Sequence, residues 1–146
     1  MKIIAHRGNV SGPNPERENH PDYIDAALAL GFEVEIDIRY FRGRWALGHD
    51  SLKYPVSRAW LDERADRLWM HCKSLMAIQM ALDIPTFHCF WHETDSYTLT
   101  SQGYVWTYPG TPAMEKCVLV DLNAESTDRK HLAGICTDYP LRVRGT

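Results

Sequence analysis

The chain of 146 residues is 45% hydrophobic and carries a formal net charge of -3. This length predicts a single domain over residues 1–146 with a hydrophobic core, and the lack of a basic excess argues against nucleic acid as a partner. No apolar run is long enough to cross a bilayer, and the short apolar start before His6 is unlike a secretory signal, so we expect a cytoplasmic protein with no membrane span. The four cysteines form no CxxC pair and are predicted to be buried, reduced thiols.

Strands and helices alternate along most of the chain. In chain order the pattern predicts a strand over residues 2–5, a helix from Pro21 to Gly31, strands over 32–40 and 45–48, a helical stretch over 61–67, a strand over 68–72, a helix over 74–82, and strands over 86–91, 117–120 and 134–137. Residues 94–112 and 121–130 are predicted to be loops. Short apolar strands that alternate with helices indicate a parallel α/β sheet.

Charge is concentrated where these strands end. In parallel α/β folds the functional side chains gather beyond the carboxyl ends of the strands, so groups far apart in sequence meet at one edge, which we call the rim. The strand ends supply His6, Arg7, Glu35, Asp37, Arg39, His71, Lys73, His92, Glu93, Asp95 and Asp138. We therefore expect a polar site at the rim.

Glu35 and Asp37 are the most informative pair. They are two residues apart in a strictly alternating strand, so both side chains point to one face. Two carboxylates this close favour a shared cation, and oxygen ligands suit Mg²⁺ or Ca²⁺ better than Zn²⁺. The alternative is a half-exposed strand with a solvated acidic face.

His6 with Arg7, and His49 with Asp50, supply further parts of a phosphate site. The Arg fork matches phosphate oxygens, and His is suited to moving protons near neutral pH. Taken alone, each pair also fits polar residues that simply meet solvent beyond a strand. Together with the two carboxylates, they form the parts of a metal-assisted phosphodiester site.

A zinc site built from His88, Cys89 and His92 is a weaker alternative. Strand alternation turns Cys89 away from the face shared by the two histidines, and no CxxC or HExxH motif supports the site. The chain also lacks the GxSxG motif of a serine nucleophile.

Several stretches together resemble a known family. They are His6-Arg7, Glu18-Asn19, Glu35-x-Asp37, His49-Asp50 and Thr137-Asp138-Tyr139-Pro140. The order HR…ExD…H is similar to the signature of the glycerophosphodiester phosphodiesterases, and the resemblance reaches from residue 3 to residue 140.

The resemblance implies a TIM-barrel fold and metal-dependent hydrolysis of a phosphodiester. It implies that Glu35 and Asp37 hold Mg²⁺ or Ca²⁺. Arg7 would bind phosphate together with Lys73, and His6 and His49 would be the acid/base pair beside Arg7 in the catalytic set. In the family, a neighbouring hydroxyl of the substrate can attack phosphorus, and water then opens the cyclic phosphate.

The chain departs from the family pattern in two places. Where the family has Glu-x-Lys, this chain has His71-Cys72-Lys73, so the third metal ligand would be His71 or Glu93. A TIM barrel typically takes ~250 residues, so the short chain implies a reduced barrel or a homodimer. The aromatic stretch from Tyr97 to Tyr108 is then either a lid over an organic headgroup or apolar cover for a barrel with few helices.

We therefore expect an α/β protein with a reduced, TIM-barrel-like parallel β/α fold and fewer helices than a full barrel. Its expected function is hydrolysis of a small, glycerol- or sugar-linked phosphodiester. The alternative is a non-catalytic module of the same fold that binds phosphate or a headgroup, and the replacement at His71 is the feature that favours it.

Overall fold

The computed structural model describes residues 1–145 and shows a mixed α/β protein. Within these residues ten strands form one sheet: β1 (Lys2–His6), β2 (Glu33–Phe41), β3 (Arg44–Leu47), β4 (Tyr54–Val56), β5 (Leu68–Cys72), β6 (Cys89–Phe90), β7 (Tyr97–Leu99), β8 (Val105–Thr107), β9 (Cys117–Val120) and β10 (Gly134–Thr137). The helices are α1 (Pro21–Ala29), α2 (Arg58–Arg64), α3 (Leu75–Leu82) and α4 (Pro140–Arg144), with a 3₁₀ turn over Ala65–Arg67.

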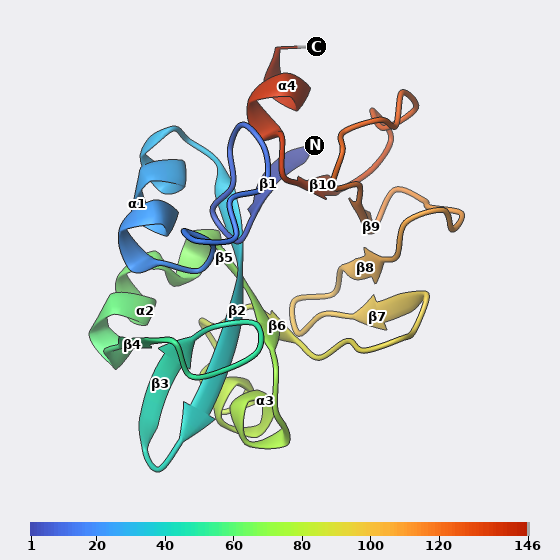
Figure 1. Cartoon of the computed structure of the whole chain (residues 1–146). Helices are drawn as coiled ribbons and strands as arrows, with labels where there is room; N and C mark the ends of the chain where they lie inside the picture. Colours follow the sequence, from blue (N-terminus) through green and yellow to red (C-terminus); the bar gives the residue numbers. More distant parts are fainter. Residues whose placement is uncertain (146) are drawn as a thin grey trace.

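Most of the sheet is parallel. The parallel strands lie in the order β6-β5-β2-β1-β10-β9-β8, so β1 sits between β2 and β10 and the first and last strands are neighbours (Figure 1). Antiparallel pairing extends β2 into β3 and β4 and adds β7 to β8. The carboxyl ends of the parallel strands therefore share one rim, as the sequence predicts.

The sheet is strongly curled. Its two parallel ends approach each other where the backbone N–H of Ser101 donates to the carbonyl of Cys89 at 2.9 Å, and the rings of Phe90 and Trp106 lie 4.5 Å apart. The inside of the curl is filled by one buried cluster, made of Ile4, Trp69, Phe90, Trp106, Val118 and Cys136. The other strand face packs against helices, because alternation turns Val34, Ile36 and Ile38 outward.

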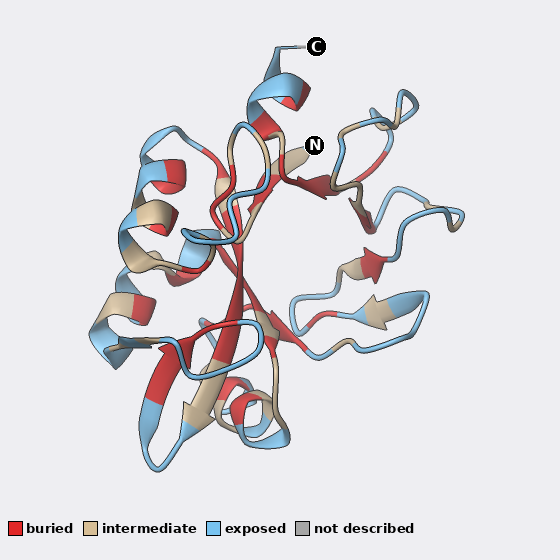
Figure 2. Ribbon diagram, in the orientation of Figure 1, coloured by how far each residue is buried: buried red, intermediate tan, exposed pale blue. Residues whose placement is uncertain are grey.

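Helices cover only one side of the curled sheet. Figure 1 shows α1, α2 and α3 gathered around β1, β2 and β5, whereas loops alone surround β7, β8 and β9. Figure 2 shows that the helix faces turned toward the sheet are buried. On the loop-covered side, Cys117, Leu119 and Leu132 form a small separate cluster outside the sheet. The expectation of few helices is confirmed: the curled, mostly parallel sheet has helices on one side only.

Several elements differ from the sequence prediction. Residues 94–112 were expected to be loop but contain β7 and β8, and β4 at Tyr54–Val56 was also missed. These strands have only three residues, so their own pattern is too short to reveal them, and pairing with neighbouring strands of the sheet stabilises them. The strand expected over 86–91 shrinks to Cys89–Phe90, and α2 begins at Arg58 instead of residue 61.

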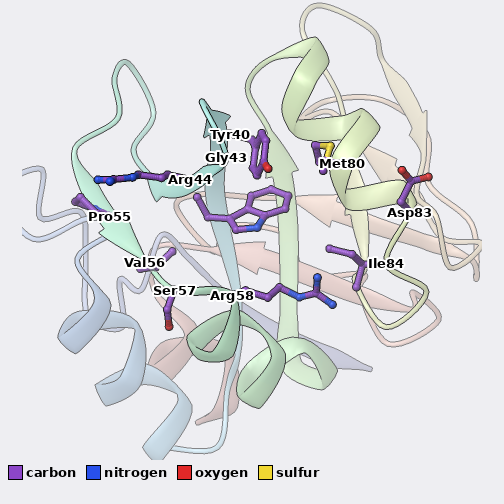
Figure 3. Close-up of a pocket in the computed structure, with 11 residues that line it drawn as sticks. Tyr40, Gly43, Arg44, Pro55, Val56, Ser57, Arg58, Met80, Asp83 and Ile84 are labelled. Carbon is purple, nitrogen blue, oxygen red and sulfur yellow. The ribbon is translucent and has the colours of Figure 1, made fainter.

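A cavity of about 580 Å³ lies outside the sheet, between the β3–β4 hairpin and α3 (Figure 3). Tyr40, Trp45, Arg58 and Met80 are among its lining residues, and no residue predicted for the site lines it. All four cysteines are free and buried, as predicted. Among the described residues, no helix combines the length and apolar character needed to cross a membrane.

Candidate metal centre and acid/base site

The rim collects side chains from four neighbouring strands. They are His6 and Arg7 after β1, Glu35 and Asp37 on β2, His71 and Lys73 from β5, and Asp138 after β10. All of these were named from the sequence as strand-end groups. The expectation that distant strand ends meet at one edge is therefore confirmed for these residues.

Glu35, Asp37 and His71 form what we call the ligand cluster. One ligand atom from each lies within 4.8 Å of the others. His71 Nδ1 is 3.5 Å from Glu35 Oε1 and 3.6 Å from Asp37 Oδ1, because Asp37 and His71 are directly paired across β2 and β5. Both carboxylates are buried, with exposed fractions of 2% and 0%. Among the described residues, no other His, Cys, Asp or Glu group of three has this spacing.

The tautomer of His71 follows from its contacts. Its Nε2 lies 2.9 Å from the backbone carbonyl oxygen of His92, and a carbonyl can only accept, so Nε2 carries a hydrogen. The ring also stacks on Phe90, with centroids 5.0 Å apart and planes inclined by 15°. Nδ1 is then the ring nitrogen that faces the two carboxylates: it can donate a hydrogen to them, or it can offer its lone pair to a cation held between them.

The donor set fits a divalent metal ion. Glu35 Oε2 and Asp37 Oδ1 are buried and have no hydrogen-bond partner among the described residues. Buried polar atoms of this kind need an explanation, and a metal ion supplies one. Burial alone would raise the pKa of Glu35, but His71, His6 and Arg7 lower it to about 2, so the group is a carboxylate at neutral pH.

Asp37 is held in place through its other oxygen. Asn19 Nδ2 donates to Asp37 Oδ2 at 2.9 Å, and the backbone N–H of Asp37 donates to Asn19 Oδ1 at 2.9 Å. Arg7 Nε forms an ion pair with the same Oδ2 at 2.8 Å, whereas Lys73 Nζ is 3.9 Å from Oδ1. This arrangement leaves Oδ1 facing His71.

His6 is paired with Asp138. Its Nδ1 lies 2.7 Å from Asp138 Oδ1, and because a carboxylate accepts, Nδ1 donates and Nε2 is left facing Glu35 Oε2 at 4.0 Å. Burial by itself lowers the pKa of His6, but the hydrogen bond to Asp138 and the charge of Glu35 outweigh it and raise the pKa overall. Asn9 Nδ2 donates to Asp138 Oδ1 at 2.8 Å and holds that carboxylate in turn.

The backbone beside the site is strained. Arg7 and Asn19 adopt φ values of 54° and 65°, in the left-handed region that residues other than glycine rarely occupy. The backbone N–H of Asn19 donates to the carbonyl of Arg7 at 3.0 Å, so the two strained residues are joined. Such conformations gather at functional sites when the surroundings stabilise them.

His49 and Glu93 do not join the ligand cluster. His49 is exposed, and its Nδ1 lies 2.7 Å from Asp50 Oδ1. It lines a cavity of about 500 Å³ together with Arg7 and Asn19, both of which also contact Asp37. Glu93 is exposed and forms no hydrogen bond or ion pair within residues 1–145, so His71 is the third-ligand candidate that lies with the carboxylates.

The residues of the zinc alternative do not come together, and the strand-end group Arg39 lies apart from the ligand cluster. His88 contacts Thr100 Oγ1 at 2.7 Å, and Cys89 lies in the cluster beneath the helices, so these two cannot share an ion. Arg39 donates to the carbonyls of Gly48 and His49 and thereby holds the backbone that follows β3.

The sequence interpretation missed the supporting residues. Asn9 and Asn19 hold the two functional carboxylates, and Glu18 receives hydrogen bonds from Asn9 at 2.9 Å and Arg7 at 3.2 Å. Asp138 was named as a strand-end group and as part of the stretch Thr137-Asp138-Tyr139-Pro140, without its pairing to His6. The stretch Glu18-Asn19 carried a signal through its resemblance to a family motif, whereas nothing in the local pattern marks Asn9.

Comparisons of the chain with protein-family models, curated proteins and solved structures found no match. Any statement about family and activity therefore depends on the motifs and on the geometry described above.

Proposed function

We propose that the chain is a divalent-metal-dependent phosphodiesterase with a reduced, TIM-barrel-like fold, similar to the glycerophosphodiester phosphodiesterases. Its substrate would be a small, glycerol- or sugar-linked phosphodiester. The observation that supports this most is the ligand cluster beside the His6–Asp138 pair on one rim. A cation site, an oriented imidazole and an arginine in one place are the components that phosphodiester hydrolysis needs.

Each part of the rim has a role in this proposal. Glu35, Asp37 and His71 would hold the divalent ion, which, when bound, stabilises negative charge on the phosphoryl oxygens. Arg7 and Lys73 would orient the phosphate, since both already lie beside Asp37 at the edge of the cluster. The substrate phosphate is then placed within reach of His6.

His6 and His49 would move the protons. His6 Nε2 accepts the proton of an attacking hydroxyl, and the charge of Asp138 stabilises the imidazolium that forms. As the bond from phosphorus to the leaving alcohol breaks, His49 would give its proton to that alcohol from the cavity that it lines together with Arg7. Where the attacking hydroxyl belongs to the substrate, water then opens the cyclic phosphate with the two histidines in reversed roles.

One observation favours the alternative function, a non-catalytic module that binds phosphate or a headgroup. Arg7 is already paired with Asp37 and Glu18, and His49 does not touch the cluster. A non-catalytic module that binds phosphate or a headgroup would not need a second histidine in place, so the position of His49 outside the cluster favours this alternative.

Hydrolysis assays separate the two functions. We expect the purified chain to hydrolyse bis(p-nitrophenyl) phosphate only with a divalent ion, and His6→Ala and Asp37→Asn to lower kcat/KM by about 100-fold or more. His131→Gln is the control, because His131 is exposed and precedes β10, whereas the site lies beyond the carboxyl end of that strand. Phosphate binding without turnover in any divalent ion would instead support the binding module.

A further inference from the structure

The ligand cluster offers a nitrogen where a hard cation prefers a third oxygen. Mg²⁺ and Ca²⁺ are bound almost entirely by oxygen ligands, whereas imidazole suits first-row transition ions such as Zn²⁺. Here Nδ1 of His71 is the atom that faces both Glu35 and Asp37. The identity of this one donor therefore bears on which ion the site selects.

His71 is oriented as a ligand by its surroundings. Ligating histidines almost always donate their other ring N–H to an oxygen, which fixes the tautomer and the ring. Nε2 of His71 does this to the carbonyl of His92, and the flat stacking on Phe90 restrains the ring further. Neighbouring ligands around an ion with bonds of ~2.1 Å lie roughly 3.0 to 3.4 Å apart. The separations of 3.5 and 3.6 Å thus need only a small contraction.

The charge of the site also favours a transition ion over Mg²⁺ or Ca²⁺. Affinity for hard cations follows the number of charged oxygen ligands. The cluster supplies two carboxylates instead of three, and Arg7 and Lys73 offset part of the charge of Asp37. A purely electrostatic attraction for Mg²⁺ or Ca²⁺ is weakened accordingly, whereas the nitrogen bond is not.

We propose that His71 Nδ1 makes this a site for a first-row transition ion, with Co²⁺ and Zn²⁺ bound more tightly than Mn²⁺, and Mn²⁺ more tightly than Mg²⁺ or Ca²⁺. The inference rests on the proposed function for the place of the ion in the reaction, but it concerns binding alone. Phe90 and the carbonyl of His92 act as positioning groups, so the segment around β6 contributes to ion selection without touching the ion.

Binding measurements on the full chain test this order without any hydrolysis assay. Dissociation constants for the five ions are measured at pH 7.5 by competition with a chromophoric chelator. We expect Co²⁺ and Zn²⁺ to bind about tenfold or more tightly than Mg²⁺ and Ca²⁺. Pulsed EPR of the Mn²⁺-loaded protein is expected to show coupling to a directly bound ¹⁴N nucleus.

Two variants connect the result to His71. His71→Glu replaces the nitrogen with a third carboxylate, so it should remove the ¹⁴N coupling and move the preference toward Mg²⁺ and Ca²⁺ by about tenfold. His131→Gln removes an exposed imidazole beside Asp128 and should change neither result. If His71→Glu fails to fold, the coupling in the wild-type protein still decides the question.

The outcomes distinguish this inference from the proposed function. Mg²⁺ or Ca²⁺ binding as tightly as Co²⁺, with no ¹⁴N coupling, would overturn the inference while leaving an oxygen-bound metal for hydrolysis. Ion binding in the expected order without hydrolysis of any substrate would support the inference and contradict the proposed function. No binding of any of the five ions would overturn both.

Discussion

Asp138 gives the imidazole of His6 a fixed direction. By accepting from Nδ1 it leaves Nε2 as the atom that can take a proton, and Asn9 holds Asp138 in that position. Alternation along one strand was enough to predict that Glu35 and Asp37 share a face. The residues that support Asp37 and His6 were not predictable in the same way, because Asn9, Asn19 and Asp138 come from loops and the end of a distant strand, and only the fold brings them close.

Replacing Asp138 with Asn tests this role. The amide can donate to Nδ1, which favours the tautomer with hydrogen on Nε2, so we expect kcat/KM to fall by about 100-fold or more. Loss of the carboxylate also removes a cause that raises the pKa of His6, so the acid limb of the residual pH–rate profile should move to lower pH.

Asp128→Asn is the matched control for this measurement, since Asp128 is an exposed carboxylate that also contacts a histidine, at 3.3 Å in its pair with His131. An Asp138→Asn variant with an unchanged rate and profile would show that His6 is not oriented through this bond.

At the scale of elements, the start of a helix at a capping residue was easier to predict from the sequence than a short strand. Ser74 was expected to begin a helix, and its Oγ accepts from the backbone N–H of Ala77 at 3.2 Å at the start of α3. The long alternation of β2 was equally clear. β7 and β8 were missed because three residues carry too little pattern, and their pairing depends on the neighbouring β9.

The cap of α3 has a measurable effect on stability. α3 packs against the strands that carry the ligand cluster, and Ser74→Ala should lower the free energy of unfolding by about 1 kcal/mol, because the N–H of Ala77 loses its partner. Ser74→Asp should restore most of it, since Asp is an equally good cap. Urea unfolding with Ser96→Ala as the control checks this, and equal midpoints for all four proteins would argue against the cap.

At the scale of the whole molecule, aromatic side chains form the packed core on the side of the sheet that helices do not cover. Trp106 from the loop-covered side packs against Phe90 at 4.5 Å and Trp69 at 5.9 Å inside the curl. The expectation of few helices followed from chain length. The order of the strands did not, since it depends on contacts between β1 and β10, at opposite ends of the sequence.

Truncating Trp106 should therefore weaken the whole fold. Trp106→Ala is expected to lower the free energy of unfolding by about 3 to 5 kcal/mol, because it leaves a cavity inside the curl. Trp91→Ala, at a tryptophan that is 38% exposed, should cost much less. Urea denaturation of both variants gives the comparison, and similar losses for the two would contradict the role given to the inner cluster.

Because β1 pairs with β10, the site cannot be complete during synthesis until β10 has been made. His6 and Asp138 are separated by 132 positions, and a ribosome adding 5 to 20 residues each second needs roughly 7 to 26 s to pass from one to the other. Until β10 has emerged, one edge of β1 is unpaired and His6 has no partner for Nδ1. A nascent chain can therefore bring Glu35, Asp37 and His71 together well before His6 is oriented, so the proposed activity would begin only after β10 has emerged.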